Sequence, residues 1–132
     1  MQSLTRPHIL YADDNEDSCL MLSTMLGFSS IETTSANTID EALRLAQAEQ
    51  FDLYLLDTRF PEGSDLELCR KLRAFNSSIP IVFYSGDAGE TDKAKGLAAG
   101  ADAYLVKPDS DTVAATIFRL LKQTTKSVYQ TL

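Results

Sequence analysis

Side chains that could take part in phosphoryl transfer follow four of the five short apolar runs in this sequence. They are Asp13 and Asp14 after the first run, Asp57 after the third, Ser85 after the fourth and Lys107 after the fifth. Carboxylate oxygens bind hard divalent cations, and a carboxylate can attack phosphorus. A hydroxyl and an ammonium group can hold phosphoryl oxygens and neutralise their charge. These residue types therefore indicate phosphoryl chemistry at an aspartate, provided that the fold brings them together.

The apolar runs have the length of β-strands, and a helical pattern follows each of them. Residues 9–12, 53–56 and 81–84 show no polar alternation, which predicts strands covered on both faces in the middle of a parallel sheet. The runs at 31–36 and 103–106 are weaker and suit the edges of that sheet. Strands that alternate with helices indicate βαβ units, right-handed crossovers and a three-layer α/β sandwich.

Helix start and stop signals support this organisation. Thr38 with Glu41, and Ser64 with Glu67, match a capping box, in which two side chains satisfy otherwise unpaired backbone donors. The last helical pattern continues to about residue 123, and we expect residues 124–132 to form a loose tail.

The fourth helical segment, between Gly89 and Gly100, has few apolar residues. It contains Gly96 in its interior and Leu97 as its one large apolar residue. Glycine inside a helix is less favourable than alanine by about 1 kcal/mol. We therefore expect this helix to be weakly anchored and to be among the less stable parts of the fold. An ordinary surface helix would explain the same residues equally well.

The carboxyl ends of the strands are where open α/β sheets bind ligands. Three carboxylates placed there would repel one another unless a cation lay among them, and partly hydrated oxygen sites suit Mg²⁺. Each residue also has a simpler interpretation. Asp13 and Asp14 could cap the following helix, Asp57 and Ser85 could be turn residues, and Lys107 could be a solvated strand end. Their convergence on one edge favours a shared site.

Composition limits the function further. The chain has 132 residues, 44% of them hydrophobic and 23% charged, which suits one folded domain. Its net charge of −7 argues against direct nucleic-acid binding. Arg70, Lys71 and Arg73 form one small basic cluster, for which a solvated helix face is the simplest interpretation.

Cysteine and histidine usage excludes several kinds of site. Cys19 and Cys69 are too few and too far apart for a disulfide framework or a zinc site, so buried free thiols are expected. His8, the one histidine, has no catalytic neighbour in the sequence and is interpreted as structural. No apolar run reaches membrane-spanning length and no signal peptide is evident, so we expect a cytoplasmic protein.

From about residue 7 to residue 123 the sequence resembles the receiver domain of two-component response regulators. The resemblance rests on Asp13-Asp14, Asp57 with Pro61 four residues later, Ser85-Gly86, Tyr104 and Lys107-Pro108, in the expected order and spacing. It implies a flavodoxin-like, doubly wound, five-stranded parallel sheet in the order 2-1-3-4-5, with five helices. The receiver domain would span residues 1–123, followed by the tail.

The resemblance also implies a role for each acidic residue. Asp57 would be the phosphoacceptor. Asp14, Asp57 and the backbone carbonyl of Arg59 would bind Mg²⁺ directly, and Asp13 would hold it through water.

The remaining positions would respond to the phosphoryl group. Ser85 and Lys107 would contact its oxygens, and Tyr104 would swing inward as Ser85 moves. The bond from Lys107 to Pro108 would be cis. Arg59 and Asp87 occupy positions that tune phosphate lifetime in this family.

A phosphorylation-activated switch is the function that this resemblance implies. The phosphoryl donor would be a sensor histidine kinase or a histidine phosphotransfer protein, and Mg²⁺ would be the cofactor. The signal would pass to a downstream protein effector through the face formed by the fourth helix, the fifth strand and the last helix. A homodimer through this face stays open. Apart from Mg²⁺-dependent self-phosphorylation and autodephosphorylation we expect no enzymatic activity, and no contact with nucleic acid or membrane.

Three other functions share part of this pattern. A phosphatase of the haloacid dehalogenase type needs an acid two residues after its nucleophile, where this chain has Arg59. A flavodoxin-like electron carrier needs a hydroxyl-rich loop after the first strand, where this chain has Asp13 and Asp14. A pseudo-receiver that binds partners without phosphorylation usually lacks one of the acidic or lysine positions, all of which are present.

Overall fold

The computed structural model describes residues 6–57, 60, 64–86, 89–107 and 110–131, of which 64, 110–111 and 123–131 are described by their backbone alone. Along the described chain the elements are β1 (His8–Ala12), α1 (Glu16–Gly27), β2 (Glu32–Ala36), α2 (Ile39–Ala48), β3 (Leu53–Leu56), α3 (Ser64–Phe75), β4 (Ile81–Ser85), α4 (Glu90–Ala98), β5 (Ala103–Val106) and α5 (Ser110–Thr131). The strands form one sheet in the order β2-β1-β3-β4-β5, and every neighbouring pair is parallel. The predicted fold class and strand order are confirmed.

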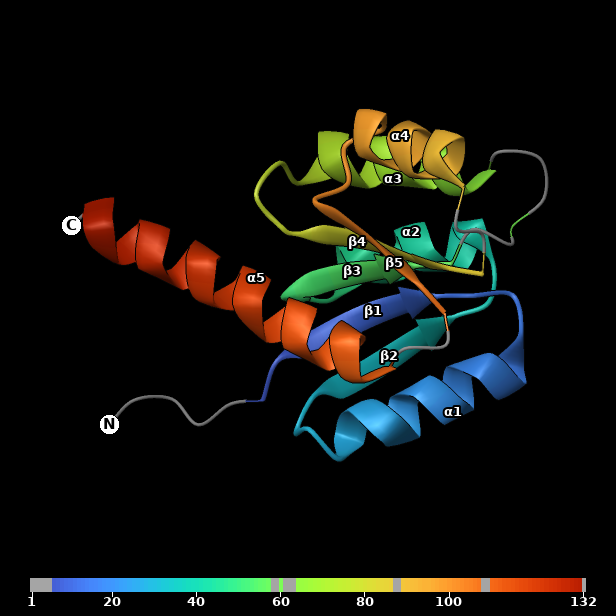
Figure 1. The fold of residues 1–132 in the computed structure, drawn as a ribbon, viewed down its shortest axis with the longest axis horizontal. Helices are drawn as coiled ribbons and strands as arrows, with labels where there is room; N and C mark the ends of the chain where they lie inside the picture. The colour runs from blue at the N-terminus through green and yellow to red at the C-terminus, as the bar shows by residue number, and fades with distance from the viewer. Residues whose placement is uncertain (1–5, 58–59, 61–63, 87–88, 108–109, 132) are drawn as a thin grey trace.

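Helices cover both faces of the sheet (Figure 1). Leu10 and Leu56 point to one face, where they pack with side chains of α2 and α3. Ile9 and Leu55 point to the other face, where they pack with side chains of α1 and α5. Since neighbouring strand residues point to opposite faces, each middle strand contributes to both cores. The three-layer sandwich is therefore confirmed.

Burial of the strands agrees with their predicted places in the sheet. All residues of β3 and β4 and four of the five in β1 are buried. The edge strands β2 and β5 are mostly half-buried. Helices on both faces explain why the middle strands carry no polar alternation.

Side-chain caps fix where two helices begin. The Asn15 side chain accepts a backbone N–H in the first turn of α1. Thr38 Oγ1 accepts the N–H of Glu41 at 3.0 Å, and the Glu41 carboxylate accepts the N–H of Asn37 at 2.9 Å. The capping box at Thr38 is confirmed, with its return bond one residue earlier than usual. The box predicted at Ser64 lies outside the described side chains.

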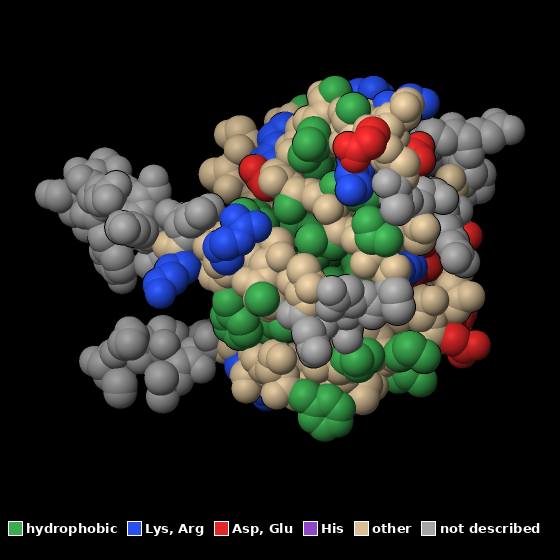
Figure 2. All heavy atoms as spheres, in the orientation of Figure 1, with side chains coloured by type: hydrophobic (Ala, Val, Ile, Leu, Met, Phe, Trp, Pro, Cys, Tyr) green, Lys and Arg blue, Asp and Glu red, His purple; other side chains and the backbone are tan. Residues whose placement is uncertain are grey.

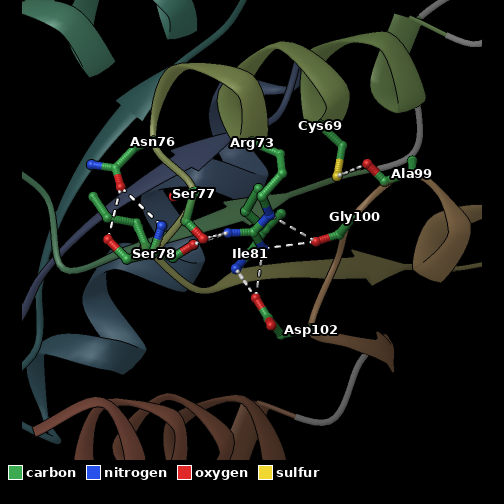
Figure 3. Close-up of polar contacts among 10 residues, drawn as sticks. Cys69, Arg73, Asn76, Ser77, Ser78, Ile81, Ala99, Gly100 and Asp102 are labelled. Carbon is green, nitrogen blue, oxygen red and sulfur yellow. Dashed lines mark hydrogen bonds and ion pairs between the residues drawn. The ribbon is translucent and has the colours of Figure 1, made fainter. Parts of the chain in front are cut away.

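Arg73 on α3 connects the loops that precede β4 and β5 (Figure 3). Its guanidinium donates to three backbone carbonyls and one carboxylate, at 2.7 Å to Gly100, 2.8 Å to Ile79, 3.1 Å to Ser77 and 2.8 Å to Asp102. The prediction of a solvated face is therefore wrong for Arg73, whereas Arg70 and Lys71 are exposed. The positive φ of 118° at Gly100 brings this turn against Arg73, which the sequence pattern does not reveal.

The helix α4 faces the sheet with a glycine. Gly96 is its buried residue and lies against the rings of Phe83 and Tyr104, whereas Leu97 is 50% exposed. The predicted scarcity of apolar anchoring is confirmed. Gly96 has a packing reason that sequence alone did not show, because only a residue without a side chain fits so close to Phe83.

The last helix is longer than expected. α5 continues to Thr131, so the prediction of a loose tail from residue 124 is wrong for the conformation of the described residues 124–131. No glycine or proline follows Pro108, so the sequence contains no residue that would end the helix earlier. Whether the receiver domain ends at residue 123 stays a prediction. No helix among the described residues combines the length and apolar character needed to cross a membrane.

Candidate functional site: an acidic pocket at the strand ends

Backbone pairing brings the polar side chains together at one edge of the sheet. The N–H of Asp57 donates to the carbonyl of Ala12 at 2.9 Å, and the N–H of Lys107 donates to the carbonyl of Ser85 at 2.7 Å. These bonds continue the parallel ladders one residue beyond the strands. Asp13, which directly follows Ala12, therefore lies beside Asp57, and Lys107 reaches both.

Asp13 is buried, and hydrogen-bond donors contact both of its carboxylate oxygens. Its Oδ2 accepts from the hydroxyl of Tyr11 at 2.6 Å, and its Oδ1 accepts from the N–H of Asn15 at 2.9 Å. The ammonium of Lys107 lies 3.4 Å from Oδ2. Donors on both oxygens hold this carboxylate in one orientation.

Asp57 is equally buried, but its oxygens are much freer. Both Asp57 and Asp13 are 0% exposed. Neither oxygen of Asp57 accepts a well-aligned hydrogen bond from a described residue. Burial raises the pKa of Asp57, and the charge of Asp13 raises it further, while Lys107 acts in the opposite direction. A buried carboxylate whose close partner among the described residues is a single ammonium group is costly, which indicates a group kept available for a ligand or a reaction.

Lys107 is the cation of the pocket. Its Nζ lies 3.2 Å from Asp57 Oδ1 and 3.4 Å from Asp13 Oδ2, and its side chain is 19% exposed. The same ammonium lies 5.5 Å from the centroid of the Tyr84 ring. Two carboxylates and an aromatic face thus direct Lys107 into the pocket.

The other predicted residues occupy the surrounding edge. Asp14 is exposed beside the buried acids. Ser85 is fully buried at the end of β4. Tyr104 is half-buried on β5, with its ring 6.0 Å from that of Phe83. Arg59, Asp87 and Pro108 lie outside the described residues, so their predicted roles and the cis bond stay predictions.

The acidic residues fit a divalent cation. Asp13, Asp14 and Asp57 each offer one carboxylate oxygen, and these oxygens lie within 4.8 Å of one another. Neither buried oxygen of Asp57 accepts a well-aligned hydrogen bond from a described residue, which is the second, independent sign of a ligand site. An all-oxygen set that is partly open to water suits Mg²⁺. The alternative that Asp13 or Asp14 caps α1 is not supported, because Asn15 does so.

Two residues of the pocket were not recognised from the sequence. Tyr11 and Tyr84 were counted as parts of apolar strands, yet Tyr11 binds Asp13 and Tyr84 lies under Lys107. The signal was available for Tyr11. It stands two residues before Asp13 and therefore points to the same face of the strand.

Comparison with known proteins identifies the family. The model of the response regulator receiver domain matches residues 9–118. The chain belongs to the response regulator receiver family. Receiver domains of this family act in two-component signalling and are generally not enzymes in the usual sense.

Curated relatives agree with this assignment. The chain is 36% identical over 102 residues to the alkaline phosphatase synthesis transcriptional regulatory protein PhoP of Bacillus subtilis, covering 77% of this chain and 42% of PhoP. It is 31% identical over 116 residues to the cell cycle response regulator CtrA of Brucella ovis, and this match covers 87% of this chain and 50% of CtrA. This receiver chain thus spans about half the length of the curated relatives it matches.

Solved receiver domains have the same fold. The Francisella response regulator 1452 receiver domain is 30% identical with a TM-score of 0.83, and the match covers 90% of this chain and 99% of that one. A CheY-like receiver domain protein of Methanospirillum hungatei JF-1 is 28% identical with a TM-score of 0.85, and the match covers 92% of this chain and 98% of that one. Family membership sets aside the phosphatase and the electron carrier. The pseudo-receiver stays open, because it is an alternative within the family.

Proposed function

We propose that this chain is a phosphorylation-activated switch in which Asp57 accepts a phosphoryl group. The observation that carries the proposal is the state of Asp57. It is buried, accepts no well-aligned hydrogen bond from the described residues, and lies 3.2 Å from Lys107. A nucleophile needs an accessible lone pair, and donors hold both oxygens of Asp13 but leave those of Asp57 less engaged.

The phosphoryl donor would be a phosphohistidine of a sensor histidine kinase or a histidine phosphotransfer protein. An Asp57 oxygen would form the new bond to phosphorus, and the bond from phosphorus to the histidine nitrogen would break, with its electron pair returning to the imidazole. Lys107 would pair with the phosphoryl oxygens. When bound by Asp14, Asp57, the carbonyl of Arg59 and, through water, Asp13, Mg²⁺ would supply further neutralisation of those oxygens.

An apolar surface beside the pocket supports a protein as donor. Met21 and Met25 on α1, with Tyr84 and Lys107, line a groove of about 130 Å³. Leu20 and Met21 on the same helix are 68% and 65% exposed. Apolar side chains gather at the lower edge of the view in Figure 2, where Figure 1 places α1. Large exposed apolar side chains around a reactive pocket are typical of a docking surface, and methionine adapts to varied partners.

The switch itself would follow from charge. A phosphoryl group carries roughly −1.5 to −2 charges in place of the single charge of the Asp57 carboxylate, and it brings three acceptor oxygens. Contact of these oxygens with Ser85 and Lys107 would draw the ends of β4 and β5 inward. Moving an equilibrium from 1:99 to 99:1 needs about 5.5 kcal/mol, of which two charge-assisted hydrogen bonds supply about 1.5–3 kcal/mol each. Tyr104 on β5 and Gly96 on α4 touch each other, so this movement would reach the α4-β5-α5 face.

Response regulators work with histidine kinases and with downstream effectors. Since this chain carries a net charge of −7, we propose a protein effector bound through the α4-β5-α5 face, or a second copy of the chain, and no direct contact with nucleic acid. We place the exchange in the cytoplasm, where the free, buried Cys19 and Cys69 would stay reduced. Apart from Mg²⁺-dependent self-phosphorylation and autodephosphorylation, no turnover is proposed.

Phosphate lifetime would depend on Arg59 and Asp87, two residues beyond Asp57 and Ser85 in the sequence. A long cation and an anion at these positions would pair across the pocket and shield the phosphoryl group from water. Dephosphorylation rates of Arg59→Ala and Asp87→Ala test this proposal, and unchanged rates in both variants would remove it.

Mass spectrometry tests the main proposal. The wild type and Asp57→Asn are incubated with acetyl phosphate and Mg²⁺, and the intact masses are compared. We expect the mass of one phosphoryl group to be added to the wild type alone. A wild type that gains no mass under conditions that phosphorylate a known receiver domain would favour the phosphorylation-independent alternative. Equal gain in both proteins would show that another residue is the acceptor.

A further inference from the structure

Tyr11 reaches the acidic pocket from inside the sheet. Its hydroxyl donates a hydrogen bond of 2.6 Å to Asp13 Oδ2, and its side chain is 1% exposed. An O–H···O⁻ distance of this length is typical of a charge-assisted bond, which is roughly twice as strong as a neutral one. Burial, the bond to Asp13, and the charges of Asp13 and Asp57 raise the pKa of Tyr11, so the hydroxyl keeps its proton and acts as the donor.

The two buried carboxylates differ in the hydrogen-bond donors that reach them, and Tyr11 accounts for part of this difference. Asp13 receives donors from the middle of β1 (Tyr11), from the start of α1 (Asn15) and from the end of β5 (Lys107). Asp57 accepts no well-aligned hydrogen bond within the described part of the chain. Without the hydroxyl, Asp13 Oδ2 would keep only the longer contact with Lys107, at 3.4 Å, and would compete with Asp57 for that ammonium.

The hydroxyl is not needed to fill the core. The ring of Tyr11 packs in the cluster that contains Ile9, Leu55 and Val82, and a phenylalanine ring would occupy the same space. A buried hydroxyl is unfavourable unless it is hydrogen-bonded, and the partner here is a residue of the cation pocket. The side chain therefore has one part that packs and one part that acts on Asp13.

The geometry points to Tyr11 as a positioning residue of the divalent-cation site. Its hydroxyl holds the Asp13 carboxylate in a single orientation and keeps Lys107 available to Asp57. Groups that orient the residues around a metal typically contribute about 10–100-fold to affinity. This inference rests on the proposed function, because it assigns a further residue to the cation site that the phosphoacceptor would use.

The test compares Tyr11→Phe with Tyr54→Phe in Mg²⁺ titrations followed by NMR, using the backbone amide of Asn15 as reporter. Tyr54 is a matched control, since it is also 1% exposed on a middle strand but lies in the cluster on the opposite face. We expect Tyr11→Phe to raise the dissociation constant for Mg²⁺ by about tenfold or more. Tyr54→Phe should leave it within about twofold. Equal constants in Tyr11→Phe and the wild type would overturn the inference.

Phosphorylation rates separate positioning from general damage. With acetyl phosphate at low Mg²⁺, Tyr11→Phe should react several-fold more slowly than the wild type, and at saturating Mg²⁺ the two rates should converge. A rate that stays low at saturating Mg²⁺ would contradict the assignment to cation binding. In the wild type, the ring signals of Tyr11 should shift with the same Mg²⁺ dependence as the Asn15 amide, a measurement that needs no variant. Ring signals of Tyr11 that do not respond would also overturn the inference.

The outcomes distinguish this inference from the proposed function. A wild type that binds Mg²⁺ and accepts no phosphoryl group would refute the proposed function, while the effect of Tyr11→Phe on affinity would still stand. A wild type that is phosphorylated on Asp57, together with a Tyr11→Phe variant of unchanged affinity, would refute the inference alone. A wild type without any response to Mg²⁺ would refute both.

Discussion

Replacing Gly96 with alanine tests how closely α4 packs on the sheet. A Cβ at residue 96 would lie 2.9 Å from Phe83 Cδ2 and 3.2 Å from Tyr104 Cδ2. Phe83 is 0% exposed, so its ring has no free space into which it can move. Forcing an extra methyl group into a packed core costs about 1–3 kcal/mol. Alanine also gains about 1 kcal/mol over glycine in a helix, so the net loss of stability should be about 0–2 kcal/mol.

Gly27→Ala is the matched control, because a Cβ at residue 27 would meet nothing within 4 Å and Gly27 also belongs to a helix. Both variants gain helix propensity, so the difference between them isolates the clash at Phe83. Urea denaturation should place the free energy of unfolding of Gly96→Ala about 1–3 kcal/mol below that of Gly27→Ala. Equal stability of the two variants would refute the argument, since α4 would then have room to move away at no cost.

Three further predictions concern charge and hydrogen bonding. In EDTA at pH 7, Asp57→Asn should raise the melting temperature. Burial raises the pKa of Asp57, so ionising this side chain costs more in the folded protein than in the unfolded chain, and the stability of the wild type falls as the pH rises above about 4. If the stability advantage of the variant were as large at pH 3 as at pH 7, this cause would be contradicted. Arg73→Ala should lower the free energy of unfolding by about 2–4 kcal/mol, because three backbone carbonyls and the Asp102 carboxylate lose the guanidinium that donates to all of them. Arg70→Ala, at an exposed position, should change the free energy of unfolding by less than about 0.5 kcal/mol. Thr38→Ala should lower the free energy of unfolding by about 1 kcal/mol through loss of the α2 cap, as measured by the same denaturation.

The sheet and the main pocket residues could be predicted because local patterns determine them. The uninterrupted apolar runs at 53–56 and 81–84 require cover on both faces, and this places them in the middle of a parallel sheet. Parallel strands then bring their carboxyl ends to one edge, so Asp57 and Lys107 lie at the same edge, and the Lys107 side chain reaches across the end of β4 to Asp57.

Contacts that depend on exact distances could not be predicted in the same way. Arg73 was assigned to solvent because it forms a small basic cluster with Arg70 and Lys71 in the sequence, yet the turn at Gly100 lies close enough to accept its hydrogen bonds. Gly96 was interpreted only as a weak point of α4, because the sequence does not show how near the Phe83 ring lies. Both depend on segments that are far apart in the chain.

Charge balance explains why the pocket needs one carboxylate held and another free. Three carboxylates and the ammonium of Lys107 leave a formal charge of −2, which a divalent cation would neutralise. If Asp13 and Asp57 were both free, either could turn toward Lys107 or the cation, and the site would have no single nucleophile. Donation from Tyr11 and Asn15 removes Asp13 from that competition, so Asp57 is the buried carboxylate left with oxygens available to react. Phosphorylation would replace the single charge of the Asp57 carboxylate with roughly −1.5 to −2, which leaves the pocket near −1, and Lys107 is the described cation close enough to respond.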